Sequence, residues 1–218
     1  MKYIAAKSTF VLLAVLGGLL ISAPASSGQG AAPKASPPVL VTSCGQSQGP
    51  AMLNVILRKV IVGYKDVVRV PPIVIHEPIG VVYEILPLAT PEDLKATGCK
   101  TLIVTMGSSL KGMGAAGISI DDELKRIAEV IDAAHKAKIT VIGAHIEGMK
   151  RRAQGADAGD TTDEQSIDAV APHSDLLLII KDGDSDGRFT AISQGKKIPM
   201  VLAEKNMDLV AALEKLLK

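Results

Sequence analysis

The chain has very few aromatic residues and no excess of charge of either sign. Only 2% of its 218 residues are aromatic, with three Tyr, two Phe and no Trp. Stacking surfaces for bases or sugars are therefore almost absent. Lys and Arg number 24 against 23 Asp and Glu, so the formal net charge is +1. This balance argues against a nucleic acid as the partner.

The sequence also lacks an apolar run long enough to cross a membrane. The run over residues 10–21 has 12 residues, and a spanning helix needs about 20. Two lysines precede this run, and the small residues Ser22–Ala25 follow it. These three parts predict a secretory signal peptide over residues 1–25, with an uncleaved anchor as the alternative. We therefore expect an exported protein, periplasmic or extracellular, whose mature form does not associate with a membrane.

Apolar residues are plentiful elsewhere, at 47% of the chain. Residues 26–38 are mostly Ser, Gly, Ala, Gln and Pro, a composition typical of a flexible linker. The remaining length suits one domain. The sequence therefore predicts a single folded domain over residues 39–218.

Strand and helix patterns alternate about six times within this domain. A continuous apolar run is typical of a strand that is covered on both faces, and a helix pattern follows each such run. Alternation of this kind predicts a parallel sheet with helices on both faces. The fold class is therefore α/β: a doubly wound, three-layer α/β/α sandwich, Rossmann-like or flavodoxin-like, with strand order 2-1-3-4-5-6. The six predicted strands are 39–43, 81–86, 100–106, 139–145, 176–180 and 199–203.

Residues 63–80 interrupt the alternation. A loop between a helix and a strand usually has about 2–6 residues, and this segment is much longer. Its apolar runs flank Pro71-Pro72, which predicts a β-hairpin or an extended flap inserted into the domain. Val67–Ile75 is then a candidate surface for a protein partner, and an ordered surface excursion is the alternative.

The candidate ligand site follows from the predicted sheet. Loops that leave parallel strands meet at one edge, and ligands bind there. The loop after the first strand and the glycine-rich segment 107–117 are polar, and glycine allows the backbone to approach a ligand. We expect a small polar or anionic ligand, with a plain turn and a flexible loop as alternatives. The candidate residues are Ser43, Cys44, Gly45, Gln46, Ser47, Gly107, Ser108, Ser109, Lys111 and His145.

No cofactor is expected. The loop after the first strand lacks the G-x-G-x-x-G pattern of dinucleotide binding, and segment 107–117 lacks the G-K-[ST] ending of a P-loop. Lys150–Arg152 is a run of three bases, which is either a solvated loop or a further anion contact at the same edge.

Cys44, His145 and Glu147 form a second hypothesis, a cysteine-dependent hydrolase or transferase. Cys44 follows a strand and precedes a helix start, a position that lowers a thiol pKa. His145 would act as the base and Glu147 would orient it. A small packed core residue is the alternative for Cys44, so whether the protein is an enzyme stays open.

The two cysteines, Cys44 and Cys99, are predicted to be free thiols. They lie at opposite ends of neighbouring strands, about 17 Å apart, and bridged Cα atoms lie within about 7 Å of each other.

No metal site is predicted. Asp182, Asp184 and Asp186 match the first half of a calcium loop, D-x-D-x-D-G, but its twelfth position is Ser193 instead of Glu. Weak calcium binding and a solvated acidic turn are therefore the two interpretations of these residues.

The chain resembles an uncharacterised family of exported bacterial Rossmann-like α/β proteins. The resemblance rests on the run VLVTSCGQS from Val39, on KTLIV from Lys100, on segment 107–117 and on residues 182–187. It covers about residues 39–217. We know of no activity for this family, so the resemblance implies a fold and assigns no catalytic residue. The insertion at 63–80 is longer than the family pattern suggests.

Overall fold

A computed structural model describes residues 33–70, 73–153 and 161–218, and it describes no side chains over 66–76. The predicted signal peptide lies outside the described residues. The helices are α1 (Gly49–Leu57), α2 (Pro91–Thr97), α3 (Leu110–Ala116), α4 (Ile120–Lys136), α5 (Thr162–Val170), α6 (Arg188–Lys196) and α7 (Leu209–Leu216). Four short 3-10 turns are η1 (Gly148–Arg151), η2 (Ala171–His173), η3 (Lys181–Asp184) and η4 (Asn206–Asp208). Within the described ranges, none of the helices has the length and apolarity to span a membrane.

Six parallel strands form the main sheet. They are β1 (Val39–Cys44), β4 (Tyr83–Ile85), β5 (Thr101–Met106), β6 (Thr140–His145), β7 (Leu176–Ile180) and β8 (Met200–Ala203). Their order is β4-β1-β5-β6-β7-β8, with every neighbouring pair parallel. Counted along the chain, this is the predicted order 2-1-3-4-5-6. The predicted fold class and the strand order are both confirmed.

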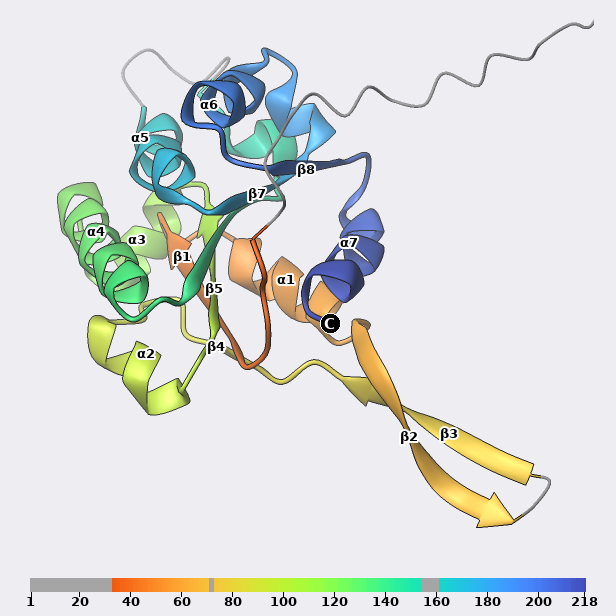
Figure 1. The fold of residues 1–218 in the computed structure, drawn as a ribbon. Helices are drawn as coiled ribbons and strands as arrows, with labels where there is room; N and C mark the ends of the chain where they lie inside the picture. The colour runs from red at the N-terminus through yellow and green to blue at the C-terminus, as the bar shows by residue number, and fades with distance from the viewer. Residues whose placement is uncertain (1–32, 71–72, 154–160) are drawn as a thin grey trace, which may run out of the picture.

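Helices cover both faces of this sheet (Figure 1). Apolar residues of α2, α4, α5 and α6 pack on one face, against side chains such as Leu102 and Val104. Apolar residues of α1 and α7 pack on the other face, against side chains such as Val41 and Ile103. Because successive residues of a strand point to opposite faces, a strand that is buried throughout feeds both cores. The three-layer sandwich thus follows from the continuous apolar runs.

The glycine-rich segment 107–117, which was expected to be a loop, is largely a helix, α3. Ser109 caps α3, since its side chain accepts a hydrogen bond from the Gly112 amide, and Gly117 ends the helix with a left-handed conformation. A serine cap and a terminal glycine are strong helix signals. Because glycine is unfavourable within a helix, the glycines of the segment outweighed these two helix signals in the sequence analysis.

The folded domain begins before Val39, so the predicted linker 26–38 is too long. Ala35 is fully buried. Ser36 exchanges two hydrogen bonds with Thr101, whose hydroxyl accepts from the Ser36 amide and donates to the Ser36 carbonyl. These contacts attach residues 35 and 36 to the start of β5.

The inserted segment is a β-hairpin, one of its two predicted forms. Strands β2 (Ile61–Val70) and β3 (Ile73–Gly80) pair antiparallel with each other and with no other strand of the described chain. Figure 1 shows the hairpin extending away from the sandwich. Val67–Val70 and Ile73–Ile75 lie toward its far end, where side chains are not described, so the partner surface predicted over Val67–Ile75 stays a prediction.

Candidate functional site

The crevice predicted at the edge between β1 and β5 is filled by the two loops that leave these strands. Gln46 and Ser108 form a β-bridge, and the Ser109 amide donates to the Gly45 carbonyl at 2.7 Å. A Cβ on Gly45 would lie 2.5 Å from the Gly107 carbonyl oxygen. The glycines of both loops therefore allow the two backbones to pack together, and the space predicted for a ligand is occupied by protein.

Helix α4 contacts the loop after β1 through two side chains, Glu123 and Arg126. The Glu123 side chain is fully buried, and its Oε1 accepts hydrogen bonds from the Gly45 amide and from Gln46 Nε2, both at 2.8 Å. Arg126 pairs with the other Glu123 oxygen at 2.9 Å and donates to the carbonyls of Ser43 and Ala89. Ser43 and Gly45 are thus held by protein contacts, contrary to the prediction that they bind a ligand.

Cys44 is a packed core residue in this structure. It is fully buried, and burial raises the pKa of its thiol to about 12, with the Ser166 hydroxyl partly opposing this effect. Cys99 is also buried, and both thiols are free, as predicted. A helix start does not lower the Cys44 pKa because desolvation of the thiolate is the larger effect.

His145 and Glu147 do not complete a catalytic triad with Cys44. The two His145 ring nitrogens lie 3.2 Å from the Met106 carbonyl and 3.1 Å from the Gly148 carbonyl. Burial lowers the pKa of His145, although both carbonyls oppose this shift. Glu147 pairs with Arg151. With its ring nitrogens directed at backbone oxygens, His145 has no basic nitrogen directed at a thiol.

We predict that Cys44 resists alkylation by iodoacetamide in the folded protein. A pKa of about 12 instead of the usual value leaves a thiolate fraction about a thousandfold lower at neutral pH. Mass spectrometry of the Cys99→Ala variant follows Cys44 alone, with the unfolded variant in urea as the control. Rapid labelling of folded Cys99→Ala would restore the cysteine-dependent enzyme hypothesis.

Asp182, Asp184 and Asp186, the weak candidates for calcium binding, have different hydrogen-bond partners. Asp184 caps α6 by accepting from the Phe189 and Thr190 amides, and Asp182 accepts from the Met149 amide at 3.0 Å. Asp186 pairs with Arg152. No cluster of three metal-ligating side chains occurs in the described part of the chain. The sequence pattern therefore corresponds to a capped turn and an ion pair.

Arg152 joins three segments at this edge of the sheet. Its side chain is 1% exposed, forms two hydrogen bonds to Asp186 and one to Glu164, and donates to the Gly183 carbonyl. Its guanidinium also lies 5.6 Å from the centre of the Phe189 ring. Arg152 was predicted as a solvated residue or an anion contact, and the structure uses it to join η1, α5 and the turn after β7.

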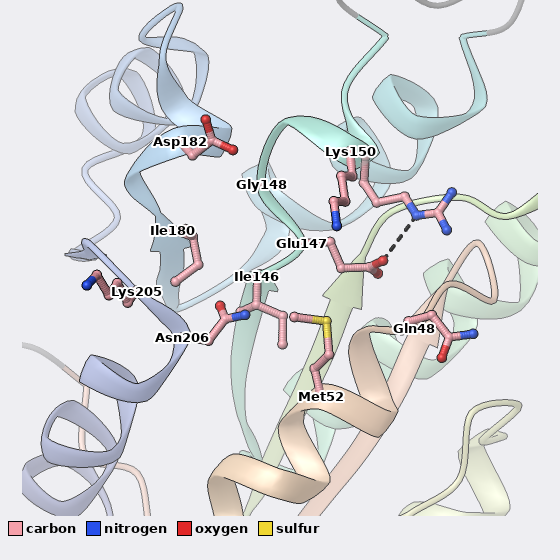
Figure 2. A pocket seen from close by; sticks show the side chains of 11 residues that line it. Gln48, Met52, Ile146, Glu147, Gly148, Lys150, Ile180, Asp182, Lys205 and Asn206 are labelled. Carbon is pink, nitrogen blue, oxygen red and sulfur yellow. Dashed lines mark hydrogen bonds and ion pairs between the residues drawn. The ribbon is translucent and has the colours of Figure 1, made fainter.

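A pocket of about 590 Å³ lies at the same edge, toward β6, β7 and β8. We call it the edge pocket. Figure 2 shows Gln48, which precedes α1, and Met52, which lies in α1, on one side of the edge pocket. Ile180, Asp182 and Lys205 lie on the other side. Ile146 and Glu147 lie between them. The lining residues are Gln48, Met52, Ile146, Glu147, Gly148, Lys150, Arg151, Ile180, Asp182, Lys205 and Asn206.

Glycine is required at one point of the pocket wall. Gly148 has a φ of +62°, and a Cβ there would lie 2.6 Å from Asp182 Oδ2. The glycine lets η1 approach the turn after β7, so that the Met149 amide donates to Asp182. The wall between β6 and β7 is therefore closed by contact of the η1 backbone with the Asp182 side chain.

The pocket carries charges of both signs. Lys150, Arg151 and Lys205 line it together with Glu147 and Asp182. Arg151 is paired with Glu147 at 3.1 Å, and it also donates to the Ser108 carbonyl. In the described part of the chain, the ammonium groups of Lys150 and Lys205 form no ion pair. The pocket thus presents two available cations.

Two oxygen atoms at the pocket lack hydrogen-bond donors. Glu147 Oε1 and Asn206 Oδ1 are buried and have no partner within the described structure. The Glu147 side chain is 7% exposed. Such atoms are rare in folded proteins, because a buried acceptor without a donor costs about 1–3 kcal/mol.

The edge pocket lies at the edge of the sheet where the sequence predicts a ligand, but beside different strands. Glu147, Asp182 and two residues of the predicted basic run, Lys150 and Arg151, line the edge pocket, and the ten predicted ligand residues do not. Lys111 is exposed on α3, and Ser47 accepts from the Gly49 amide at 3.4 Å. Met52, Ile180, Lys205 and Asn206 were missed because nothing in their sequence surroundings distinguishes them from ordinary helix, strand and turn residues.

Comparison with known families identifies the chain. A family model described as a domain of unknown function (DUF6305) matches residues 73–217, more than half of the chain. The chain belongs to this family. No curated protein sequence matches it.

The match confirms the predicted resemblance to an uncharacterised family. It begins at Ile73, so β1 and α1 lie before the DUF6305 span, which is shorter than the predicted 39–217. Nine of the eleven pocket residues fall within the matched span, and Gln48 and Met52 precede it. Export and a bacterial source stay predictions.

Proposed function

We propose that this DUF6305 domain binds a small polar ligand with an anionic group in the edge pocket. The observation that carries the proposal is the pair of ammonium groups, on Lys150 and Lys205, that line one pocket without ion-pair partners in the described chain. A volume of about 590 Å³ is within the usual range of small-molecule sites.

The position of the pocket supports the same proposal. It lies beyond the carboxyl ends of β6, β7 and β8, where open α/β sheets bind ligands. The first turn of α1 borders it through Met52, and the positive end of a helix favours negative charge. Each of these features favours an anion in the edge pocket.

Binding is better supported than the cysteine-dependent reaction. The Cys44 thiol is fully buried, is not a lining residue, and has a raised pKa. The His145 nitrogens are directed at backbone carbonyls. Neither group reaches a ligand in the edge pocket.

Calorimetry and thermal shift at low ionic strength test the proposal, with phosphate, citrate, succinate and the twenty amino acids as probes. A ligand that binds the wild type should lose about tenfold or more in affinity in the Lys150→Gln/Lys205→Gln variant, because two charge-assisted contacts are lost. Lys125→Gln, an exposed lysine of α4, is the matched control and should bind like the wild type. Failure of every probe to bind, or equal binding by the double variant, would contradict the proposal.

A further inference from the structure

The two lysines of the edge pocket lie apart from each other. Lys150 belongs to η1, after β6, and Lys205 precedes η4, beyond β8. Both residues line the pocket, and Figure 2 shows them on different sides of it. A single carboxylate or phosphate is a compact group, so it binds one of these ammonium groups and leaves the other without a negative partner.

The acids that line the pocket are bound to other groups. Glu147 pairs with Arg151 through one oxygen, and its other oxygen is buried. Asp182 accepts a hydrogen bond from the Met149 amide at 3.0 Å. Within the described residues, neither acid forms an ion pair with a lysine of the pocket. Each lysine therefore calls for its own negative group, and a ligand can supply both.

The wall between the two lysines carries no charge. Ile146 and Ile180 line the pocket, and Figure 2 shows them between Lys150 and Lys205. An isoleucine side chain neither donates nor accepts a hydrogen bond, so a polar group at this point of a ligand would lose its contacts with water and gain none. A hydrocarbon segment has no such cost. The volume of about 590 Å³ is sufficient for a small molecule that extends across the pocket.

We infer that the ligand is a small aliphatic dicarboxylate. One carboxylate is bound by Lys150, the other is bound by Lys205, and the hydrocarbon between them lies against Ile146 and Ile180. The inference rests on the proposed function, to which it adds a second anionic group separated from the first by an apolar chain.

Separation of the two charges is the property to test. Calorimetry at neutral pH and constant, low ionic strength compares malonate, succinate, glutarate, adipate and pimelate. Sulfate is the first control because it is divalent like these ligands but has its charge on one compact group. The second control is the monocarboxylate with the same number of carbons as the dicarboxylate that binds most tightly.

We expect the best dicarboxylate to bind about tenfold or more tightly than either control, because it makes a second charge-assisted contact. Affinity should pass through a maximum along the series. A chain that is too short does not reach the second lysine, and a chain that is too long loses more conformational freedom when it is bound.

Single substitutions show whether the two ends bind separately. Lys150→Gln and Lys205→Gln should each weaken the best dicarboxylate about tenfold, and the double variant should weaken it about a hundredfold, because independent contacts are additive. The monocarboxylate contacts one lysine at a time, so at least one single variant should bind it within about twofold of the wild type. Lys125→Gln is again the matched control, and melting temperatures establish that each variant is folded.

The outcomes separate this inference from the proposed function. If sulfate or phosphate binds as tightly as every dicarboxylate, the dicarboxylate assignment fails and the anion site stands. If the best dicarboxylate loses affinity in only one of the two single variants, the assignment also fails, since its second carboxylate is not bound by a lysine. If none of the anions binds, both proposals fail.

Discussion

Replacing Arg152 by methionine is expected to lower the free energy of unfolding by about 3 kcal/mol, because removing one member of a buried ion pair leaves its partners unpaired. Glu164 and Asp186 would both lose their contacts to Arg152, and the Gly183 carbonyl would lose a donor. Methionine is an unbranched apolar side chain that fills part of the same space, so the decrease in the free energy of unfolding reports mainly on the lost contacts of the guanidinium. Urea unfolding followed by circular dichroism measures it.

Arg188→Met is the matched control for this variant. Arg188 pairs with the same carboxylate, Glu164, at 3.1 Å, but its side chain is 32% exposed. A partly exposed pair of this kind contributes about 0–1 kcal/mol. Equal destabilisation by the two variants would show that Arg152 does not have the structural role assigned to it.

The effect of Arg152→Met should depend on pH. The hydrogen bonds from Arg152 lower the pKa of Asp186, and Arg152 also lowers the pKa of Glu164 against the opposing effect of burial. A carboxyl group with a lowered pKa stabilises the folded state above its unfolded pKa, which is about 4, and this stabilisation is lost as the pH falls further. The difference between wild type and variant should therefore be full at pH 7 and become smaller below about pH 4.

His145 adds a second pH effect at milder acidity. Burial lowers its pKa, with the Arg152 charge contributing in the same direction. The unfolded chain then binds a proton more readily than the folded chain does, so stability decreases as the pH falls below about 6.5. Removing the Arg152 charge should weaken this decrease as well.

The sheet could be predicted from the sequence because it depends on local patterns. Continuous apolar runs such as Leu176–Ile180 are buried throughout, as predicted. The strand order then follows from right-handed connections between parallel strands. The Gly45 and Gly107 loops show the limit of this reasoning, since glycine permits close approach to a ligand or to another backbone, and sequence does not distinguish the two.

The edge pocket could not be predicted because its residues acquire their roles from distant partners. Arg151 pairs with one carboxylate oxygen of Glu147, and the surrounding chain buries the other oxygen without giving it a donor in the described structure. Lys205 and Asn206 reach the pocket from the end of β8, about sixty residues after Glu147. Burial and unsatisfied hydrogen bonds are properties of the assembled fold, so a sequence pattern contains no signal for them.

Replacing Glu123 by alanine should be at least as damaging as the loss of Arg152, at about 4 kcal/mol. Glu123 is fully buried, and its removal leaves the Gly45 amide without an acceptor and Arg126 without its ion pair. Both losses fall at the point where the loop after β1 packs on the loop after β5. The free energy of unfolding in urea, compared between wild type and Glu123→Ala, gives the cost.

Glu129→Ala is the matched control, since Glu129 belongs to the same helix and is exposed, and its replacement should change stability by less than about 0.5 kcal/mol. Glu123→Gln separates charge from shape, because an amide oxygen can still accept from the Gly45 amide while the ion pair with Arg126 is lost. We expect its cost to lie between those of the two alanine variants. A Glu123→Ala protein as stable as Glu129→Ala would mean that the loop packing of Gly45 on Gly107 holds this edge of the sheet without the buried pair beneath it.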